Sequence, residues 1–214
     1  RHGPLRKSWD GTANGSGSDA GPFDGEGTAV QLLGAGYARD RLDGVVTGSC
    51  TRDGDDGTDA VAELVRASRF DDHVQCVMVQ GITVGGFNVL DVAALATSLN
   101  RPVVIVVRRL PRFDRIRDAL RNVEGGDAKW ALIEAAGEPQ PCGDVWIQWA
   151  GTDLETAVET VAMHTRFGAC PQPLRVAHLP VSSTHLTTPT LFPATHSRSR
   201  LNPARLPQIH THLT

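Results

Sequence analysis

The chain has 214 residues, of which 40% are hydrophobic, and this suits one domain, or one domain followed by a tail. Its formal charge of −3 gives no overall attraction to nucleic acid or to an anionic membrane. No apolar run approaches the roughly 18–20 residues of a transmembrane helix, so we expect no membrane contact. The four cysteines are far apart and form no C-x-x-C pair, which disfavours zinc and disulfides and fits the reduced thiols of a cytoplasmic protein.

The first part of the chain is predicted to lack regular structure. The chain begins with Arg1 rather than Met, so we expect a truncated or processed N-terminus. Residues 1–18 are rich in Gly, Ser and Asn, which is typical of a disordered segment or a loop. Asp19 opens a turn-like sequence that contains a Gly-Pro pair. Two strand candidates then follow, Val30–Tyr37 and Leu42–Cys50, and the short polar link between them predicts a hairpin.

An acidic loop comes next, with four aspartates between residues 53 and 59. Thr58 can cap a helix that runs to about Ser68. Glycines separate the acids as in calcium loops, but the glutamate at loop position 12 and the flanking helices of an EF-hand are missing. The clustered carboxylates could bind Mg²⁺ together with an acid from elsewhere in the chain. The alternative is a solvated turn before a helix, where the helix dipole favours aspartate.

The stretch 74–95 combines a strand, a glycine-rich turn and a helix. The apolar run Val74–Val79 predicts a buried strand, and a helix-like pattern extends over Asn88–Leu99. Ligands and catalytic groups collect where strand carboxyl ends meet such turns, which here is Gln80 and Gly81. No Gly-Lys-Ser/Thr follows, so the turn is not a phosphate-binding P-loop. Its glycines favour a close approach of backbone or substrate.

A second apolar run, Val103–Val107, predicts a strand parallel to the first and buried on both faces. Arg108, Arg109 and Arg112 follow it directly, and they could contact phosphates or form an ordinary charged loop. Further along, the patterns predict three helices and one strand: helices over Asp114–Val123, Lys129–Ala136 and Leu154–His164, and a strand over Val145–Trp149.

The C-terminal part changes character. Pro171-Gln172-Pro173 breaks the chain before the short apolar segment Leu174–Leu179, which carries His178. A lone histidine there is more often structural than a ligand. Residues 182–214 are dominated by Thr, Ser, Pro, His and Arg without periodicity, and we expect a disordered tail. Whether this tail belongs to the native protein stays open.

Several motifs, in this order, resemble the endonuclease dU family. They are Phe70, Gly81-Ile82-Thr83, Gly86-Phe87-Asn88-Val89, Asp91, and the segments 102–108, 129–139 and 171–179. The resemblance spans about residues 19–181. The family looks like a relative of endonuclease V, which implies an α/β, ribonuclease-H-like fold. Such a fold has a mixed five-stranded sheet with an antiparallel three-strand portion and flanking helices.

The resemblance also implies a chemistry. It points to hydrolysis of a phosphodiester in DNA near a deaminated base, deoxyuridine or deoxyinosine, with Mg²⁺ or Mn²⁺ as cofactor. Carboxylates can hold such ions, which activate water and stabilise the leaving oxygen, and damaged bases unstack readily. The implied metal or catalytic residues are Asp19, Asp53, Asp56, Gln80 and His178, and the implied substrate contacts are Gly81, Gly86, Asn88, Arg108 and Arg109.

The chain departs from the family pattern at two acids. The family has Asp-Gly where this chain has Gln80-Gly81, and Asp-Asp where it has Asp19-Ala20. Glutamine is neutral and can offer a metal ion only its amide oxygen. Three hypotheses remain. The chain is a metal-dependent endonuclease weakened at Gln80, a degenerate nucleic-acid-binding protein of the same fold, or a flavodoxin-like small-ligand module without the early hairpin.

Overall fold

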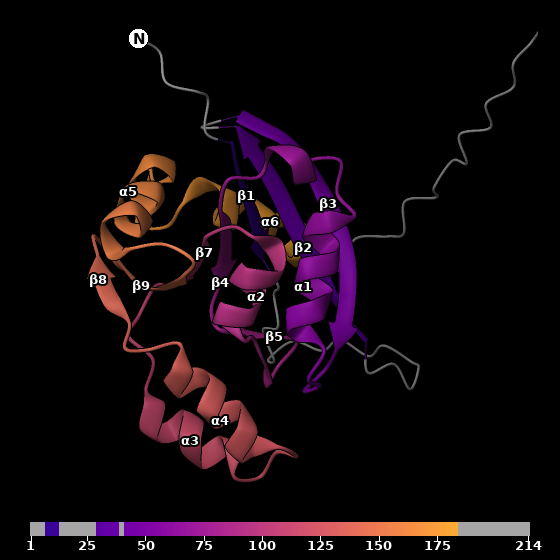
Figure 1. Ribbon diagram of the computed structural model, residues 1–214, viewed down its shortest axis with the longest axis vertical. Helices are drawn as coiled ribbons and strands as arrows, with labels where there is room; N and C mark the ends of the chain where they lie inside the picture. Colours follow the sequence, from indigo (N-terminus) through magenta and orange to yellow (C-terminus); the bar gives the residue numbers. More distant parts are fainter. Residues whose placement is uncertain (1–6, 13–28, 39–40, 184–214) are drawn as a thin grey trace, which may run out of the picture.

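The computed structural model describes residues 7–12, 29–38 and 41–183. In this part of the chain, seven strands form one mixed sheet in the order β3-β2-β1-β4-β7-β9-β8 (Figure 1). The strands are β1 (Lys7–Thr12), β2 (Ala29–Ala38), β3 (Arg41–Thr51), β4 (Val77–Gln80), β7 (Val103–Val107), β8 (Gln140–Cys142) and β9 (Val145–Ala150). A separate two-stranded sheet pairs β5 (Thr83–Val84) with β6 (Asn88–Val89).

The flanking helices are α1 (Gly57–Arg66), α2 (Val92–Leu99), α3 (Phe113–Leu120), α4 (Gly126–Ala135), α5 (Leu154–His164) and α6 (Gln172–Ser183), with a short 3₁₀ helix at Asp71–His73. Within the described residues, none of the helices is both long and apolar enough to cross a membrane.

The pairing confirms the predicted hairpin and the predicted parallel strands. β2 is antiparallel to both β1 and β3, and β4 is parallel to both β1 and β7. These contacts give the expected mixed sheet with an antiparallel three-strand portion. The sheet is larger than the expected five strands, because β9 and β8 extend it by antiparallel pairing beyond β7.

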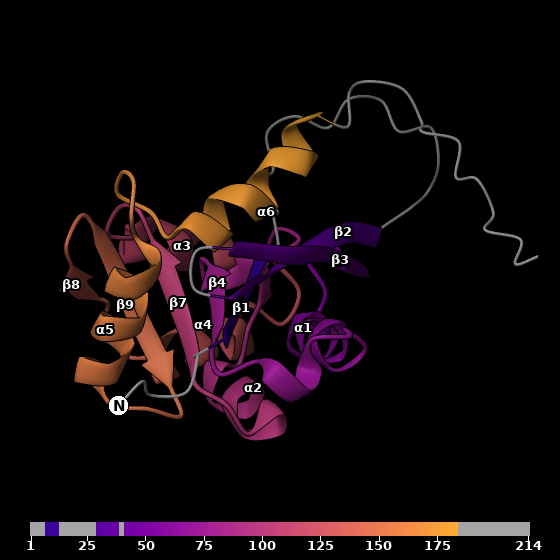
Figure 2. The same cartoon turned by 90° about the horizontal axis from the view of Figure 1, so that it is seen from above.

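Helices cover both faces of the sheet. Val77 and Val79 of β4 pack in one core with α1 and α2, whereas Met78 packs in a second core with α5 and α6. Successive side chains of a strand point to opposite faces, so a run of apolar residues fills two cores at once. Figure 2 shows α6 on one side of the sheet and α1 and α2 on the other.

The prediction of a disordered segment over residues 1–18 is wrong for Lys7–Thr12. These residues form β1, which lies between β2 and β4 and pairs with both. Pairing on two sides decides the conformation here, because a strand can use the backbone groups of its neighbours whatever its own weak propensity. The polar composition of β1 hides this, since the partners are distant in sequence.

Two predicted helix starts also differ from the structure. The helix expected from Asn88 is preceded by β6, and α2 begins at Val92 with the Asp91 carboxylate accepting a hydrogen bond from the Ala94 amide at 2.8 Å. Thr58 does not cap α1. Its hydroxyl accepts a hydrogen bond from the Asp91 amide at 2.9 Å and so joins α1 to the start of α2.

The expected break before Leu174 is instead the start of α6, which contains all of Leu174–Leu179 and runs to Ser183. Pro173 is the second residue of this helix, where the missing N–H has no partner to lose in the first turn. Residues 184–214, the rest of the predicted tail, lie outside the described residues.

Helices α3 and α4 form a lobe below the sheet in Figure 1. Leu120 and Ile133, one from each helix, are buried together with Val89 of β6. Phe113 of α3 and Trp130 of α4 meet edge to face, with ring centroids 6.4 Å apart. The lobe is therefore attached to the domain through the β5–β6 hairpin.

Replacement of Leu95 by alanine tests the core between the sheet and α2. Leu95 is fully buried there, and truncation of such a leucine leaves a cavity that lowers the free energy of unfolding by about 2–5 kcal/mol. Urea denaturation of the variant measures this loss. Leu154→Ala is the control, because Leu154 is 41% exposed and should change stability by less than about 1 kcal/mol. Equal losses in the two variants would contradict the assignment of Leu95 to the core.

Candidate functional site

Three parts of the chain meet at one edge of the sheet. β1, β4 and β7 are mutually parallel, so their carboxyl ends lie at the same edge. β3 runs in the same direction, because it is antiparallel to β2, which is antiparallel to β1. The edge therefore gathers Gln80, the loop after Thr51 and the arginines after Val107. Ligands of α/β sheets bind at such an edge.

Gln80 is the last residue of β4 and pairs with Val106 of β7. It is half-buried, as is Gly81. The Gly81 amide donates to the Val106 carbonyl at 3.1 Å, and its φ of +83° is a conformation that favours glycine. Among the described residues, a Cβ at Gly81 would meet no atom within 4 Å. These residues therefore leave space beside this glycine.

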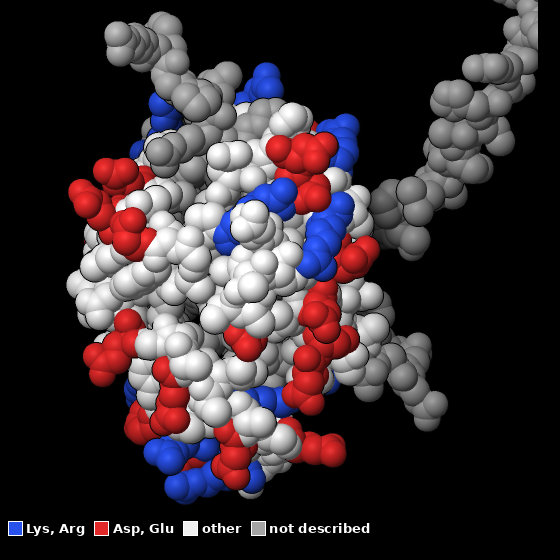
Figure 3. Space-filling view, in the orientation of Figure 1, with Lys and Arg blue, Asp and Glu red and all other residues white. Residues whose placement is uncertain are grey.

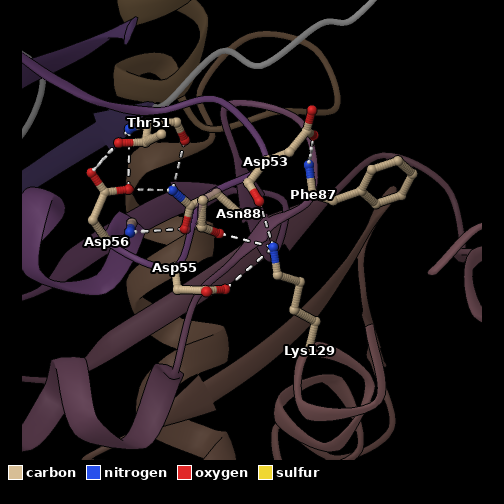
Figure 4. A network of polar contacts seen from close by, with 9 residues as sticks. Thr51, Asp53, Asp55, Asp56, Phe87, Asn88 and Lys129 are labelled. Carbon is tan, nitrogen blue, oxygen red and sulfur yellow. Dashed lines mark hydrogen bonds and ion pairs between the residues drawn. The ribbon is translucent and has the colours of Figure 1, made fainter. Parts of the chain in front are cut away.

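The carboxylate of Asp56 is held inside the loop that joins β3 to α1 (Figure 4). The Thr51 amide donates to both oxygens, at 3.1 and 3.0 Å, and the Thr51 hydroxyl donates to Oδ2 at 2.9 Å. Asn88 donates to Oδ1 at 2.7 Å. Burial raises the pKa of Asp56, but these hydrogen bonds outweigh it and hold the pKa below its ordinary value.

Asn88 is the centre of this network. Its side chain is fully buried and comes from β6. The amide nitrogen donates to the Thr51 carbonyl at 2.9 Å as well as to Asp56, and the amide oxygen accepts from the Gly57 amide at 2.8 Å. All these contacts lie within the protein, so Asn88 is placed inside the loop and away from any surface that a substrate could reach.

Asp53 binds the neighbouring turn between β5 and β6. Its carboxylate accepts a hydrogen bond from the Phe87 amide at 2.7 Å, and its own amide donates to the Gly85 carbonyl at 2.8 Å. A Cβ on Gly86 would collide with the same carboxylate. Gly86 is therefore needed for this close approach. Asp53 itself has a φ of +55°, which is uncommon for a residue with a side chain.

Lys129 of α4 closes the loop from the other side. Its side chain is only 3% exposed, and its ammonium group donates to the carbonyls of Asp53 and Gly54 at 2.5 and 3.0 Å. It also lies 3.2 Å from a carboxylate oxygen of Asp55. A buried ammonium group needs such partners, because burial without them is costly. Lys129 thus connects the acidic loop to the α3–α4 lobe (Figure 4).

The described residues alone do not fit a divalent metal ion. Within them, no three side chains of His, Cys, Asp or Glu form a group that could hold a metal. Asp56 already accepts hydrogen bonds from Thr51, Asp53 accepts one from the Phe87 amide, and Gln80 offers only a neutral oxygen. Asp19 lies outside the described residues, and His178 lies on α6 without a described side chain. The implied metal roles of these residues stay predictions.

The remaining predicted residues, Arg108 and Arg109, follow the last residue of β7 and are both exposed. They lie at the same edge as Gln80. The first strand also carries an acid that sequence reasoning missed: Asp10 on β1, in register with Met78 of β4. The roles of Thr51 and Lys129 were missed as well. Lys129 and Asp53 are 76 residues apart, and no local pattern signals that contact.

Replacement of Lys129 by methionine tests the connection between the loop and the lobe. Methionine keeps most of the stem but leaves the Asp53 and Gly54 carbonyls without their donor, so the free energy of unfolding should fall by about 1–3 kcal/mol. Urea denaturation measures the fall, and protease sensitivity of residues 51–57 should rise. Arg121→Gln removes an exposed ion pair and should cost no more than about 1 kcal/mol. An equal effect of both variants would contradict the role of Lys129.

Replacement of Asp56 by asparagine tests the charge inside the loop. The pKa of Asp56 is lowered on folding, so the aspartate stabilises the fold above the unfolded-state pKa of about 3.9, and this contribution is lost as pH falls through the folded-state value. Asp56→Asn should therefore be less stable than the parent at neutral pH, with the difference shrinking in acid. Denaturation curves at several pH values measure this. A difference that is constant with pH would contradict the prediction.

Comparison with known proteins identifies relatives among the UPF0215 proteins. A curated UPF0215 protein of Deinococcus radiodurans is 42% identical over 178 residues, which cover 82% of this chain and 91% of that protein. One from Methanosarcina barkeri is 35% identical over 155 residues, covering 70% and 80%.

Solved structures show the fold. A protein of unknown function from Archaeoglobus fulgidus superposes with a TM-score of 0.73 and 29% identity, covering 83% of this chain and 97% of that one. Endonuclease V of Bacillus subtilis superposes with a TM-score of 0.54 and 8% identity, covering 85% and 81%, and it shares the ribonuclease-H-like fold. The sequence pattern of the family described as endonuclease dU matches residues 13–184, and the chain belongs to that family.

Proposed function

We propose that this protein is an endonuclease that cuts DNA containing deaminated bases, deoxyuridine or deoxyinosine, and that it cuts slowly because Gln80 stands where its family carries an aspartate. Membership of the endonuclease dU family over residues 13–184 is the observation that carries the proposal. The fold supports it, since Gln80 lies at the sheet edge where such sheets bind their ligands.

A dependence on Mg²⁺ or Mn²⁺ belongs to the same proposal. The support for it is the family alone, because the described donors do not fit a metal ion by themselves. Asp19 would have to supply charge at the edge beside Gln80. Removal of divalent ions with a chelator should abolish cutting, and added Mg²⁺ or Mn²⁺ should restore it.

A second function is favoured by one observation, the neutral side chain at the end of β4. A chain that keeps the fold and the basic edge but lacks ligand charge can bind nucleic acid without cutting it. In that case the protein would recognise DNA and serve as a binding protein. The two functions predict different results in one assay.

The assay is nicking of duplexes that contain uracil or hypoxanthine, with Mg²⁺ or Mn²⁺ present. Gln80→Asp restores the missing charge and should raise the cutting rate. Residues that only support a metal ligand are worth about 10–100-fold, so a direct ligand should give at least about tenfold. Gln80→Asn is the matched control, because it has the length of aspartate without its charge, and it should cut no faster than the parent.

Each result separates the two functions. Slow cutting by the parent, with a rise in Gln80→Asp only, supports the endonuclease. If neither the parent nor Gln80→Asp cuts either duplex while both still bind DNA, the endonuclease proposal fails and the binding function holds.

A further inference from the structure

Six arginines and two aspartates lie between residues 108 and 121, in a chain whose overall charge is negative. All six arginines are exposed. They occupy the link after β7, the helix α3 and the residue after it. In Figure 3, basic atoms lie together with some acidic atoms at the lower end of the molecule, where Figure 1 places the lobe. The segment 108–121 is therefore basic, although the chain as a whole is not.

Two of these arginines are engaged within the protein. The guanidinium group of Arg117 lies 5.3 Å from the centre of the Trp130 ring, as in a cation–π contact. Arg121 forms an ion pair with Asp118 at 3.1 Å. Both contacts stabilise the lobe locally, so these two arginines have a structural use.

The other four have no such use. Among the described residues, neither an ion pair nor a hydrogen bond is formed by the side chains of Arg108, Arg109, Arg112 and Arg115, which we call the arginine strip. Four neighbouring guanidinium groups without a carboxylate partner repel one another. An anion that binds them would relieve that repulsion.

The strip is continuous from the sheet edge to the helix. Arg108 is two residues beyond Val106, the partner of Gln80, and neighbouring strands are only about 4.8 Å apart. Arg112 is the residue just before α3, and Arg115 lies in the first turn of that helix. The apolar residues of this helix pack inward in the lobe: Phe113, Ile116 and Leu120. Arg112 and Arg115 are both exposed and so lie on the outer surface at the start of α3.

We propose that the arginine strip binds successive phosphates of a nucleic-acid backbone, so that the bound strand runs from the sheet edge at Gln80 along α3. This inference rests on the proposed function, because it takes DNA as the ligand of that edge. Its new part is the extension over Arg112 and Arg115, which places the lobe against the substrate. The contacts are to phosphate and so do not depend on base sequence.

Nucleic acid fits the strip better than an acidic protein does. Guanidinium groups bind carboxylate and phosphate alike with two parallel hydrogen bonds, but a nucleic-acid backbone carries a phosphate at every nucleotide, so one strand can meet several arginines. The charge near α1 also directs the path. Acidic atoms line the α1 side in Figure 3, which includes the exposed residues Asp59 and Glu63, and they would repel a polyanion.

The test compares two double variants of the full chain that lose the same charge from the same segment. Arg112→Gln with Arg115→Gln removes half of the strip, and Arg117→Gln with Arg121→Gln removes the engaged pair. Glutamine has a helix propensity similar to that of arginine, so α3 should persist, and circular dichroism and thermal unfolding check this. Binding of a fluorescent duplex, with and without uracil, is measured at several salt concentrations in the presence of a chelator.

The strip variant should bind both duplexes roughly tenfold or more weakly at about 0.1 M salt, because each lost phosphate contact lowers the slope of log affinity against log salt by about 0.9. The control variant should keep the slope of the parent. Equal losses in both variants, an unchanged slope in the strip variant, or no DNA binding by the parent would each overturn the proposal. Equally strong binding of poly-glutamate, lost in the same variant, would assign the strip to an acidic protein partner.

The outcome is independent of the cutting assay. A strip variant that loses affinity, in a protein that never cuts even as Gln80→Asp, refutes the endonuclease and leaves the strip in place. A protein that cuts normally while the strip variant binds like the parent refutes the strip alone.

Discussion

The amide of Asn88 joins two pieces of backbone and one carboxylate that no regular secondary structure joins. It fixes the end of β3 through the Thr51 carbonyl, the start of α1 through the Gly57 amide, and the carboxylate of Asp56 between them. Because the side chain is fully buried, water cannot replace these contacts without opening the loop. The loop in turn positions Asp53, which binds the β5–β6 turn, and its backbone receives Lys129 from the lobe. The amide of Asn88 therefore supports the loop on which the contacts of Asp53 and Lys129 depend.

These contacts give the aspartates of the loop a structural role. Clustered aspartates in a glycine-rich loop suggest a cation site, yet Asp56 is surrounded by donors from Thr51 and Asn88, and Asp55 faces the ammonium group of Lys129. These partners compensate the negative charge of the loop. Within the described residues, the loop therefore offers no group of three metal-binding side chains beside Gln80. The missing charge at Gln80 would therefore matter more for a bound ion than it would if the aspartates of the loop had no partners.

Part of this arrangement could be read from the sequence. The β2–β3 hairpin, the parallel pair of β4 and β7, and α5 were predicted, because each depends on a local pattern of apolar residues and turns. β1 could not be predicted in the same way, since its residues KSWDGT become a strand only through pairing with neighbours on both sides. The contacts of Lys129 and Asn88 join segments more than 30 residues apart, and a single sequence carries no signal for them.

Binding of a nucleic acid and cutting of its backbone need different kinds of side chain. Affinity for a polyanion needs several positive groups spread over a surface, and any one of them can be lost at modest cost. Cutting needs a few ligands at one point, where a single neutral side chain removes a large part of the charge that holds an ion. The arginine strip and Gln80 lie at the same edge and illustrate the difference. Under the proposed function, a neutral side chain at the end of β4 weakens cutting, whereas the charge of the arginine strip is the same whether or not that position carries an acid.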